Sequence, residues 1–152
     1  MRDIVCGGRD FGVLPVRKNF ASETIYNAAL VLRMEQREFL MRFLDTLDPA
    51  TTFLIHGGAS GADRLAGEWA TANGVPYKVY SADWSIGKAA GPMRNTRMLV
   101  EGKAQRVIAF AGGKGTGDMI KQAEKAGIII VQPKQTNKSV ANKSVGMPKP
   151  FC

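Results

Sequence analysis

Three glycine-rich turns hold the residues of this chain whose types and spacing suit ligand binding. They are the stretches 7–10 (GGRD), 57–63 (GGASGAD) and 112–116 (GGKGT), and each follows a short apolar run. Glycine lets the backbone approach an anion closely, and the first free N–H groups of a helix point at such an anion. A phosphate group is the ligand that this chemistry favours. A single turn of this kind is explained equally well as a tight connection between a strand and a helix. The inference of a ligand site therefore depends on the occurrence of three such turns.

Polar side chains in and beside the first two turns add candidate contacts. Arg9 can pair with a phosphate or carboxylate, and Asp10 can accept a hydrogen bond from a ribose hydroxyl or cap a turn. Asp63 has the same two possibilities, a ribose hydroxyl or local N–H groups. His56 is the one histidine, and it is either a general base or a side chain packed at a strand end.

Two further charged residues are candidates for chemistry at a glycosidic bond. Arg94 follows Pro92 at the expected start of a helix, where a cation opposes the helix dipole, so it has either a ligand-binding purpose or an exposed position that tolerates it. Asp118 follows the third turn, and its carboxylate either takes part in catalysis or favours the N-terminus of the next helix.

The pattern of apolar residues indicates how these turns are positioned. Strands are expected at residues 2–6, 52–56, 75–80, 107–110 and 128–131. Helices are expected at residues 23–47 and 60–72. A further helix begins at residue 93, and the last one follows the third glycine turn and ends at about residue 125. The first part of the long helix, 25–32, can also be a separate short helix or a flap. Strands alternating with helices imply right-handed crossovers and a parallel sheet. The glycine turns then lie along one edge, beyond the carboxyl ends of the strands.

Length and composition bound the class of protein. A chain of 152 residues with 45% hydrophobic residues is expected to form one cytoplasmic domain, because no apolar run reaches the length of a membrane span and no signal sequence is recognised. Two distant cysteines and a single histidine indicate neither a disulfide framework nor a metal site. We therefore expect no metal, no cofactor and no membrane partner.

The chain carries a formal net charge of +8, which raises the possibility of nucleic-acid binding. Four of these charges come from a segment without acidic residues, at Lys134, Lys138, Lys143 and Lys149. We expect residues 133–152 to form a basic, disordered tail. Nucleic acid is therefore a possible partner but not the favoured one, since no recognised nucleic-acid-binding motif is present.

Five motifs in order resemble the YspA-like branch of the SLOG superfamily, whose relatives include the LOG phosphoribohydrolases and the DprA proteins. The motifs are GGRDF at 7–11, GGASGADRLAGEWA at 57–70, ADW at 82–84, AAGPMRNTRML at 89–99 and AFAGGKGTGDM at 109–119. The resemblance covers a domain of residues 1–132, within which 12–32 is a probable insertion or flap. It implies an α/β, Rossmann-like three-layer fold with a mainly parallel sheet of about five strands in the order 3-2-1-4-5.

The resemblance also implies roles for particular residues. In the LOG enzymes the Gly-Gly-x-Gly-Thr turn holds the 5′-phosphate, an arginine lies near the glycosidic bond, and a glutamate three residues after the threonine helps to cleave it. The arginine corresponds to Arg94, whereas the glutamate position is Met119 and the nearest carboxylate is Asp118. A shift of one residue rotates a side chain by about 100° around a helix, so Asp118 and the LOG glutamate would point in different directions.

We therefore expect a protein that binds a nucleotide or nucleotide-derived small molecule, as a sensor or a sequestering protein, and that forms a homo-oligomer. The first alternative is a LOG-like phosphoribohydrolase that cleaves the N-glycosidic bond of a nucleoside 5′-monophosphate, with Arg94 and Asp118 as catalytic residues. The second is DprA-like binding of single-stranded nucleic acid. The expected ligand-binding residues are Gly7, Gly8, Arg9, Asp10, Gly57, Gly58, Ala59, Gly61, Asp63, Asp83, Trp84, Arg94, Asn95, Gly112, Gly113, Lys114, Gly115 and Thr116.

Overall fold

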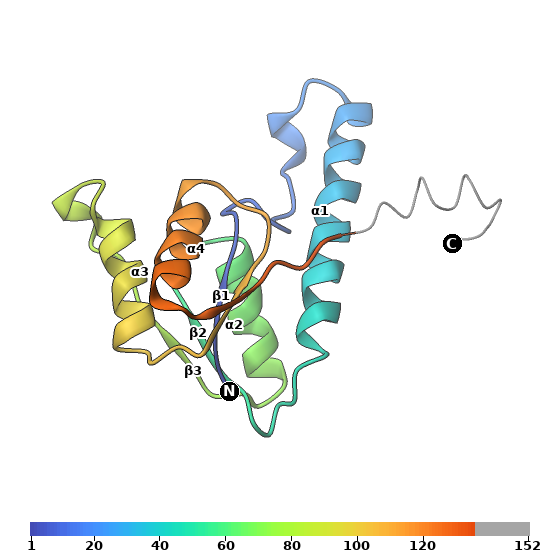
Figure 1. Ribbon diagram of the computed structural model, residues 1–152. Helices are drawn as coiled ribbons and strands as arrows, with labels where there is room; N and C mark the ends of the chain where they lie inside the picture. Colours follow the sequence, from blue (N-terminus) through green and yellow to red (C-terminus); the bar gives the residue numbers. More distant parts are fainter. Residues whose placement is uncertain (136–152) are drawn as a thin grey trace.

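The computed structural model describes residues 1–135 and shows a parallel sheet between two layers of helices (Figure 1). The five strands have the order β3-β2-β1-β4-β5, so the predicted α/β, Rossmann-like class and strand order are confirmed. All four strand pairs are parallel. The strands are β1 (Arg2–Cys6), β2 (Phe53–His56), β3 (Tyr77–Val79), β4 (Arg106–Ala109) and β5 (Ile129–Val131).

Alternating side chains of the central strands build one core on each face of the sheet. Val5, Leu54 and Ile108 are fully buried on the face covered by α1 (Glu23–Leu44) and α2 (Ala62–Ala72). Ile4, Ile55 and Val107 are buried on the opposite face, under α3 (Ala90–Val100) and α4 (Lys114–Ala126). This two-residue period places every second side chain on the same face. Both faces are apolar, as parallel sheets require.

The long helix α1 is continuous from Glu23 to Leu44, so residues 25–32 are part of it and form no separate helix. The Ser22 side chain caps it by accepting a hydrogen bond from the Ile25 N–H at 3.2 Å. Its N-terminal half extends beyond the sheet, next to the loop that contains the 3₁₀ helix η1 (Arg17–Asn19) (Figure 1). Within residues 1–135, no helix is both long and apolar enough to span a bilayer.

Several expected boundaries are corrected. Helix α1 ends at Leu44 rather than at residue 47, and α2 begins at Ala62 rather than at residue 60. Helix α3 begins at Ala90 rather than after Pro92, because the missing N–H of a proline in the first turn breaks no intrahelical hydrogen bond. Helix α4 begins at Lys114, so the segment 114–116 is helical. Strand β3 spans only Tyr77–Val79. Most of the expected tail, residues 136–152, lies outside the described residues.

Candidate functional site

A cavity of about 640 Å³ opens beyond the carboxyl ends of β1 and β2, between the turns that follow them and the N-terminal parts of α3 and α4. Thirteen of the expected site residues line it: Gly7, Gly8, Arg9, Ala59, Asp63, Trp84, Arg94, Asn95, Gly113, Lys114, Gly115, Thr116 and Asp118. The lining also includes residues that the sequence analysis did not single out, namely Cys6, Lys88, Gly91, Pro92 and Met98.

A smaller hollow of about 170 Å³ adjoins this cavity and accounts for two more expected residues, Gly57 and Gly58. Four expected residues line neither space: Asp10, Gly61, Asp83 and Gly112. Gly61 has φ +77°, and a Cβ there would collide with the backbone of Gly8 and Arg9. Its observed role is therefore close packing of the first two turns.

The turns after β1 and β4 lie against each other, which brings residues from distant parts of the chain to one edge. The Gly8 N–H donates a 2.8 Å hydrogen bond to the Ala111 carbonyl. A Cβ at Gly112 would lie 2.7 Å from the Gly8 nitrogen, and one at Gly7 would lie 2.6 Å from the Ala62 Cβ. Glycine at these positions is required for the close approach of the turns.

The N-terminus of α4 presents free backbone donors to the cavity. Gly113 is the N-cap and supplies no side-chain acceptor, and the Gly117 N–H donates to the Gly113 carbonyl at 3.0 Å. Within residues 1–135, the N–H groups of Lys114, Gly115 and Thr116 find no acceptor. A Cβ built on Gly113 or Gly115 meets no atom within 4 Å. This arrangement suits an anion placed on the helix axis.

The side-chain amide of Asn95 links Arg94 to Asp118 in this cavity. The Arg94 Nε donates to the Asn95 Oδ1 at 3.0 Å, and the Asn95 Nδ2 donates to the Asp118 Oδ2 at 3.0 Å. Arg94 is half-buried in the second turn of α3 rather than at its first residue. Burial lowers the pKa of Arg94, and the nearby carboxylate of Asp63 opposes this shift. The guanidinium nevertheless stays charged at neutral pH.

The side chains at positions 118 and 119 point in different directions. The Asp118 Oδ2 also accepts a 2.7 Å hydrogen bond from the Gln122 Nε2, and Asp118 is the fifth residue of α4, beyond its first turn. Met119 is fully buried in the core between α4 and the sheet. The position that corresponds to the LOG glutamate therefore faces the core, whereas Asp118 faces the cavity.

Asp63 interacts with the turn that precedes its helix. Its Oδ2 accepts hydrogen bonds from the N–H groups of Gly57 at 3.0 Å and Ala59 at 3.3 Å, so the expected local interaction is observed. The side chain is buried, and burial raises the pKa of Asp63 to about 6, although the Ala59 N–H and the Arg94 charge act in the opposite direction. Near neutral pH the carboxylate therefore partly offsets the positive charge of Arg94.

Trp84 stands at the mouth of the cavity. It begins the 3₁₀ helix η2 (Trp84–Ile86), which Asp83 caps by accepting from the Ser85 N–H at 3.1 Å. The Arg9 guanidinium lies over the indole, 5.0 Å from the ring centroid. A Cβ at Gly91 would lie 3.2 Å from the ring, so the glycine leaves room for the indole against α3. The indole is about half exposed and offers a flat apolar surface.

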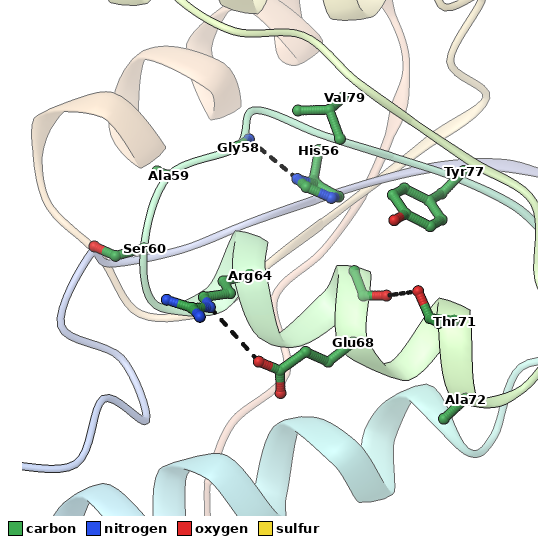
Figure 2. A pocket seen from close by; sticks show the side chains of 11 residues that line it. His56, Gly58, Ala59, Ser60, Arg64, Glu68, Thr71, Ala72, Tyr77 and Val79 are labelled. Carbon is green, nitrogen blue, oxygen red and sulfur yellow. Dashed lines mark hydrogen bonds and ion pairs between the residues drawn. The ribbon is translucent and has the colours of Figure 1, made fainter.

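His56 lies outside this cavity, in a separate hollow of about 690 Å³ between α2 and β3 (Figure 2). Its Nδ1 accepts a 3.0 Å hydrogen bond from the Gly58 N–H, and its ring stacks on Tyr77 with centroids 5.6 Å apart. Burial, helped by the Arg94 charge, lowers the pKa of His56 to about 4. The imidazole is therefore neutral at pH 7, and it is packed at a strand end.

Two other groups bear on the chemistry available here. In the described part of the chain, no three His, Cys, Asp or Glu side chains gather as metal ligands would. The Cys6 thiol lies in the lining of the 640 Å³ cavity, and burial raises its pKa to about 12, which keeps it protonated. The cavity thus offers hydrogen bonds and positive charge rather than a thiolate nucleophile.

Comparisons with known proteins agree with this architecture. The model of the YspA, cpYpsA-related SLOG family matches residues 1–87. The chain is 37% identical over 91 residues to the Gene 61 protein of Mycobacterium phage D29, covering 55% of this chain and 72% of that protein. The X-ray structure of TM1055, a structural genomics target, has a similar fold, with a TM-score of 0.55 and 17% identity over 86% of this chain and 72% of its own.

Proposed function

Because the chain belongs to the YspA, cpYpsA-related SLOG family, we propose that it binds a nucleotide or a nucleotide-derived small molecule in the 640 Å³ cavity beyond the carboxyl ends of β1 and β2. The observation that carries the proposal is the row of N–H groups at the start of α4, which have no acceptor among residues 1–135 and point into a cavity that Arg94 and Arg9 also line. Helix N-termini with glycine-rich approaches bind phosphate groups. The sheet order reverses between β1 and β4, and ligands of open α/β sheets bind at such a point.

The rest of the cavity suits the nucleoside part of such a ligand. A volume of about 640 Å³ is within the usual range for small-molecule sites. The Trp84 indole, steadied by Arg9, offers a surface on which a base can stack. Within residues 1–135, the second carboxylate oxygen of Asp118, Oδ1, accepts no hydrogen bond and can therefore receive one from a ribose hydroxyl.

Binding without cleavage is the form of the proposal that the side chains support best. Met119 is buried where a LOG enzyme has its glutamate, and the Asp118 Oδ2 is held by the amides of Asn95 and Gln122. Hydrolysis of an N-glycosidic bond is the alternative, and one observation favours it: Arg94 and Asp118 line the same cavity and are joined through Asn95.

Mass spectrometry of small molecules released from the purified protein by denaturation tests this proposal. The same protein is incubated with a panel of nucleoside monophosphates, and Gly113→Asp serves as the variant that blocks the proposed phosphate site. An unaltered nucleotide derivative that is released from the original chain and not from the variant supports binding. Equal release from both proteins contradicts the site. Free base that appears with the original chain and not with Arg94→Ala establishes hydrolysis.

The homo-oligomer is also a proposal, and the N-terminal half of α1 is the surface that suits it. Ile25, Val31, Leu32 and Met34 are each about half exposed. The N-terminal part of α1 extends beyond the sheet (Figure 1). Residues 24–34 contain one charged side chain, Arg33, so a second copy can pack against this segment with little desolvation of charge. Light scattering of Leu32→Glu tests this, with a smaller particle expected; an unchanged mass contradicts it.

A further inference from the structure

The smaller hollow beside the main cavity lies between two turns and two cations. Its walls come from the 57–60 turn, from Ser81 and Ala82 after β3, and from the side chains of Arg9, Trp84 and Arg94. It shares the lining residues Arg9, Ala59, Trp84 and Arg94 with the 640 Å³ cavity, so the two spaces adjoin. Its volume of about 170 Å³ is roughly a quarter of that of the 640 Å³ cavity, and it has room for a phosphate-sized group.

Two positive charges converge on this hollow without a matching pair of negative ones. In the described residues, neither Arg9 nor Arg94 has a carboxylate within ion-pair distance. The Arg94 Nη1 donates to the Gly57 carbonyl and its Nε to Asn95, and its Nη2 group has no acceptor in the described part of the chain. Asp63 is the nearest carboxylate, and its Oδ2 is already engaged by two N–H groups. One carboxylate therefore faces two guanidinium groups.

The donors that this hollow offers are side chains, because the N–H groups of the 57–59 turn are already engaged by Asp63 and His56. The Ser60 hydroxyl donates to the Arg9 carbonyl at 2.9 Å, which holds the Arg9 backbone at the rim. The Ser81 hydroxyl has no hydrogen-bond partner in residues 1–135. Arg9 is further oriented by the Trp84 ring below it. An anion in this space would receive hydrogen bonds from Ser81 and the guanidinium groups and would relieve the repulsion between the two cations.

We propose that this hollow is a second anion subsite, so that the ligand carries two separate anionic groups: one at the N-terminus of α4 and one between Arg9, Arg94 and Ser81. This inference rests on the proposed function for the first of these groups. Its chemical class is a nucleotide with an additional phosphoryl or carboxylate group, such as a nucleoside bisphosphate or a nucleoside diphosphate derivative. A simple nucleoside 5′-monophosphate would occupy only one subsite.

Calorimetric titration with tungstate, an analogue of phosphate, tests the inference without knowledge of the base. We expect two sites on the original chain. Ser81→Asp places a negative charge in the smaller hollow and should leave one site, whereas Gly113→Asp should remove the other. Ala89→Asp is the matched control, because Ala89 is exposed, lies at the start of α3 and lines neither space, and this variant should keep both sites.

Each outcome distinguishes the two proposals. A single site on the original chain that is lost in Gly113→Asp and kept in Ser81→Asp overturns the second subsite and leaves the proposed function standing. Two sites that both persist in Gly113→Asp overturn the phosphate site on α4. Two sites that both persist in Ser81→Asp overturn the assignment of the smaller hollow. Absence of binding overturns both proposals. Circular dichroism confirms that each variant is folded, and Arg9→Gln provides a second test of the smaller hollow if Ser81→Asp does not fold.

Discussion

Arg94 on α3 donates a 2.7 Å hydrogen bond from its Nη1 to the carbonyl oxygen of Gly57, the first residue after β2. The N–H of the same glycine donates to Asp63 at 3.0 Å, so one residue is held by both charged side chains. A Cβ at Gly57 would collide with the Arg94 guanidinium. The glycine therefore lets Arg94 and Asp63 reach the carboxyl edge of the sheet together.

Replacement of Arg94 by alanine should reduce both binding and stability. We expect at least a tenfold loss of affinity for the ligand that co-purifies with the protein, because Arg94 lines both the 640 Å³ cavity and the smaller hollow. Stability should fall by about 1–3 kcal/mol, because the Gly57 carbonyl loses its donor and the buried Asp63 loses the favourable field of a nearby cation. The double variant Arg94→Ala with Asp63→Asn should recover part of the stability and none of the affinity. Calorimetry and urea unfolding measure the two effects, and unchanged affinity would show that Arg94 is purely structural.

Gly113→Asp should abolish binding without loss of stability. The position is open, and aspartate is a favourable N-cap, so the helix is not weakened. The new carboxylate nevertheless lies where we place the phosphate. Gly117→Asp is the matched control, because Gly117 is equally open, lies one turn further along α4 and does not line the cavity. Equal affinities of the two variants in a calorimetric titration would refute the phosphate assignment.

Met119→Glu should unfold the protein rather than create a hydrolase. The side chain is fully buried between α4 and the sheet, so an ionised carboxylate there would have no polar partner. We expect a loss of about 3–5 kcal/mol in urea unfolding. Met119→Leu, which keeps the volume, should lose less than about 1.5 kcal/mol. A stable Met119→Glu variant that releases free base from a nucleoside monophosphate would show that this position can reach the cavity.

The sequence was sufficient for the fold, which depends on local patterns, whereas ligand binding by the site residues stays a prediction. Alternating apolar residues predicted the strands, and the resemblance supplied their order. The glycine turns led correctly to a shared edge of the sheet. The bridging role of Asn95 and the contact of Gly91 with Trp84 were not predictable, because they depend on how α3 packs against α4 and η2. The start of α3 was misplaced because Pro92 is compatible with either side of a helix boundary.

Asp63 and His56 should have opposite effects on stability as the pH falls. The pKa of His56 is lowered from 6.5 to about 4, so the unfolded chain binds a proton first and stability is lost as the pH falls through this range. The pKa of Asp63 is raised from 3.8 to about 6, so the folded chain binds a proton first and stability is gained as the pH falls from 6 toward 4. At 1.36 kcal/mol for each pH unit, each effect is about 3 kcal/mol, and the two nearly cancel.

Asp63→Asn should make the loss of stability due to His56 measurable. The asparagine oxygen can still accept hydrogen bonds from the N–H groups of Gly57 and Ala59, but the side chain cannot titrate. Relative to the original chain, the variant should therefore lose about 3 kcal/mol of stability between pH 6 and pH 4. His56→Asn, which keeps an acceptor for the Gly58 N–H, should show the reverse and gain relative stability over the same range. Urea unfolding at pH 7, 6, 5 and 4 measures both differences. Parallel pH profiles for all three proteins would mean that neither pKa is shifted, because only groups that titrate differently in the folded and unfolded chains make stability depend on pH.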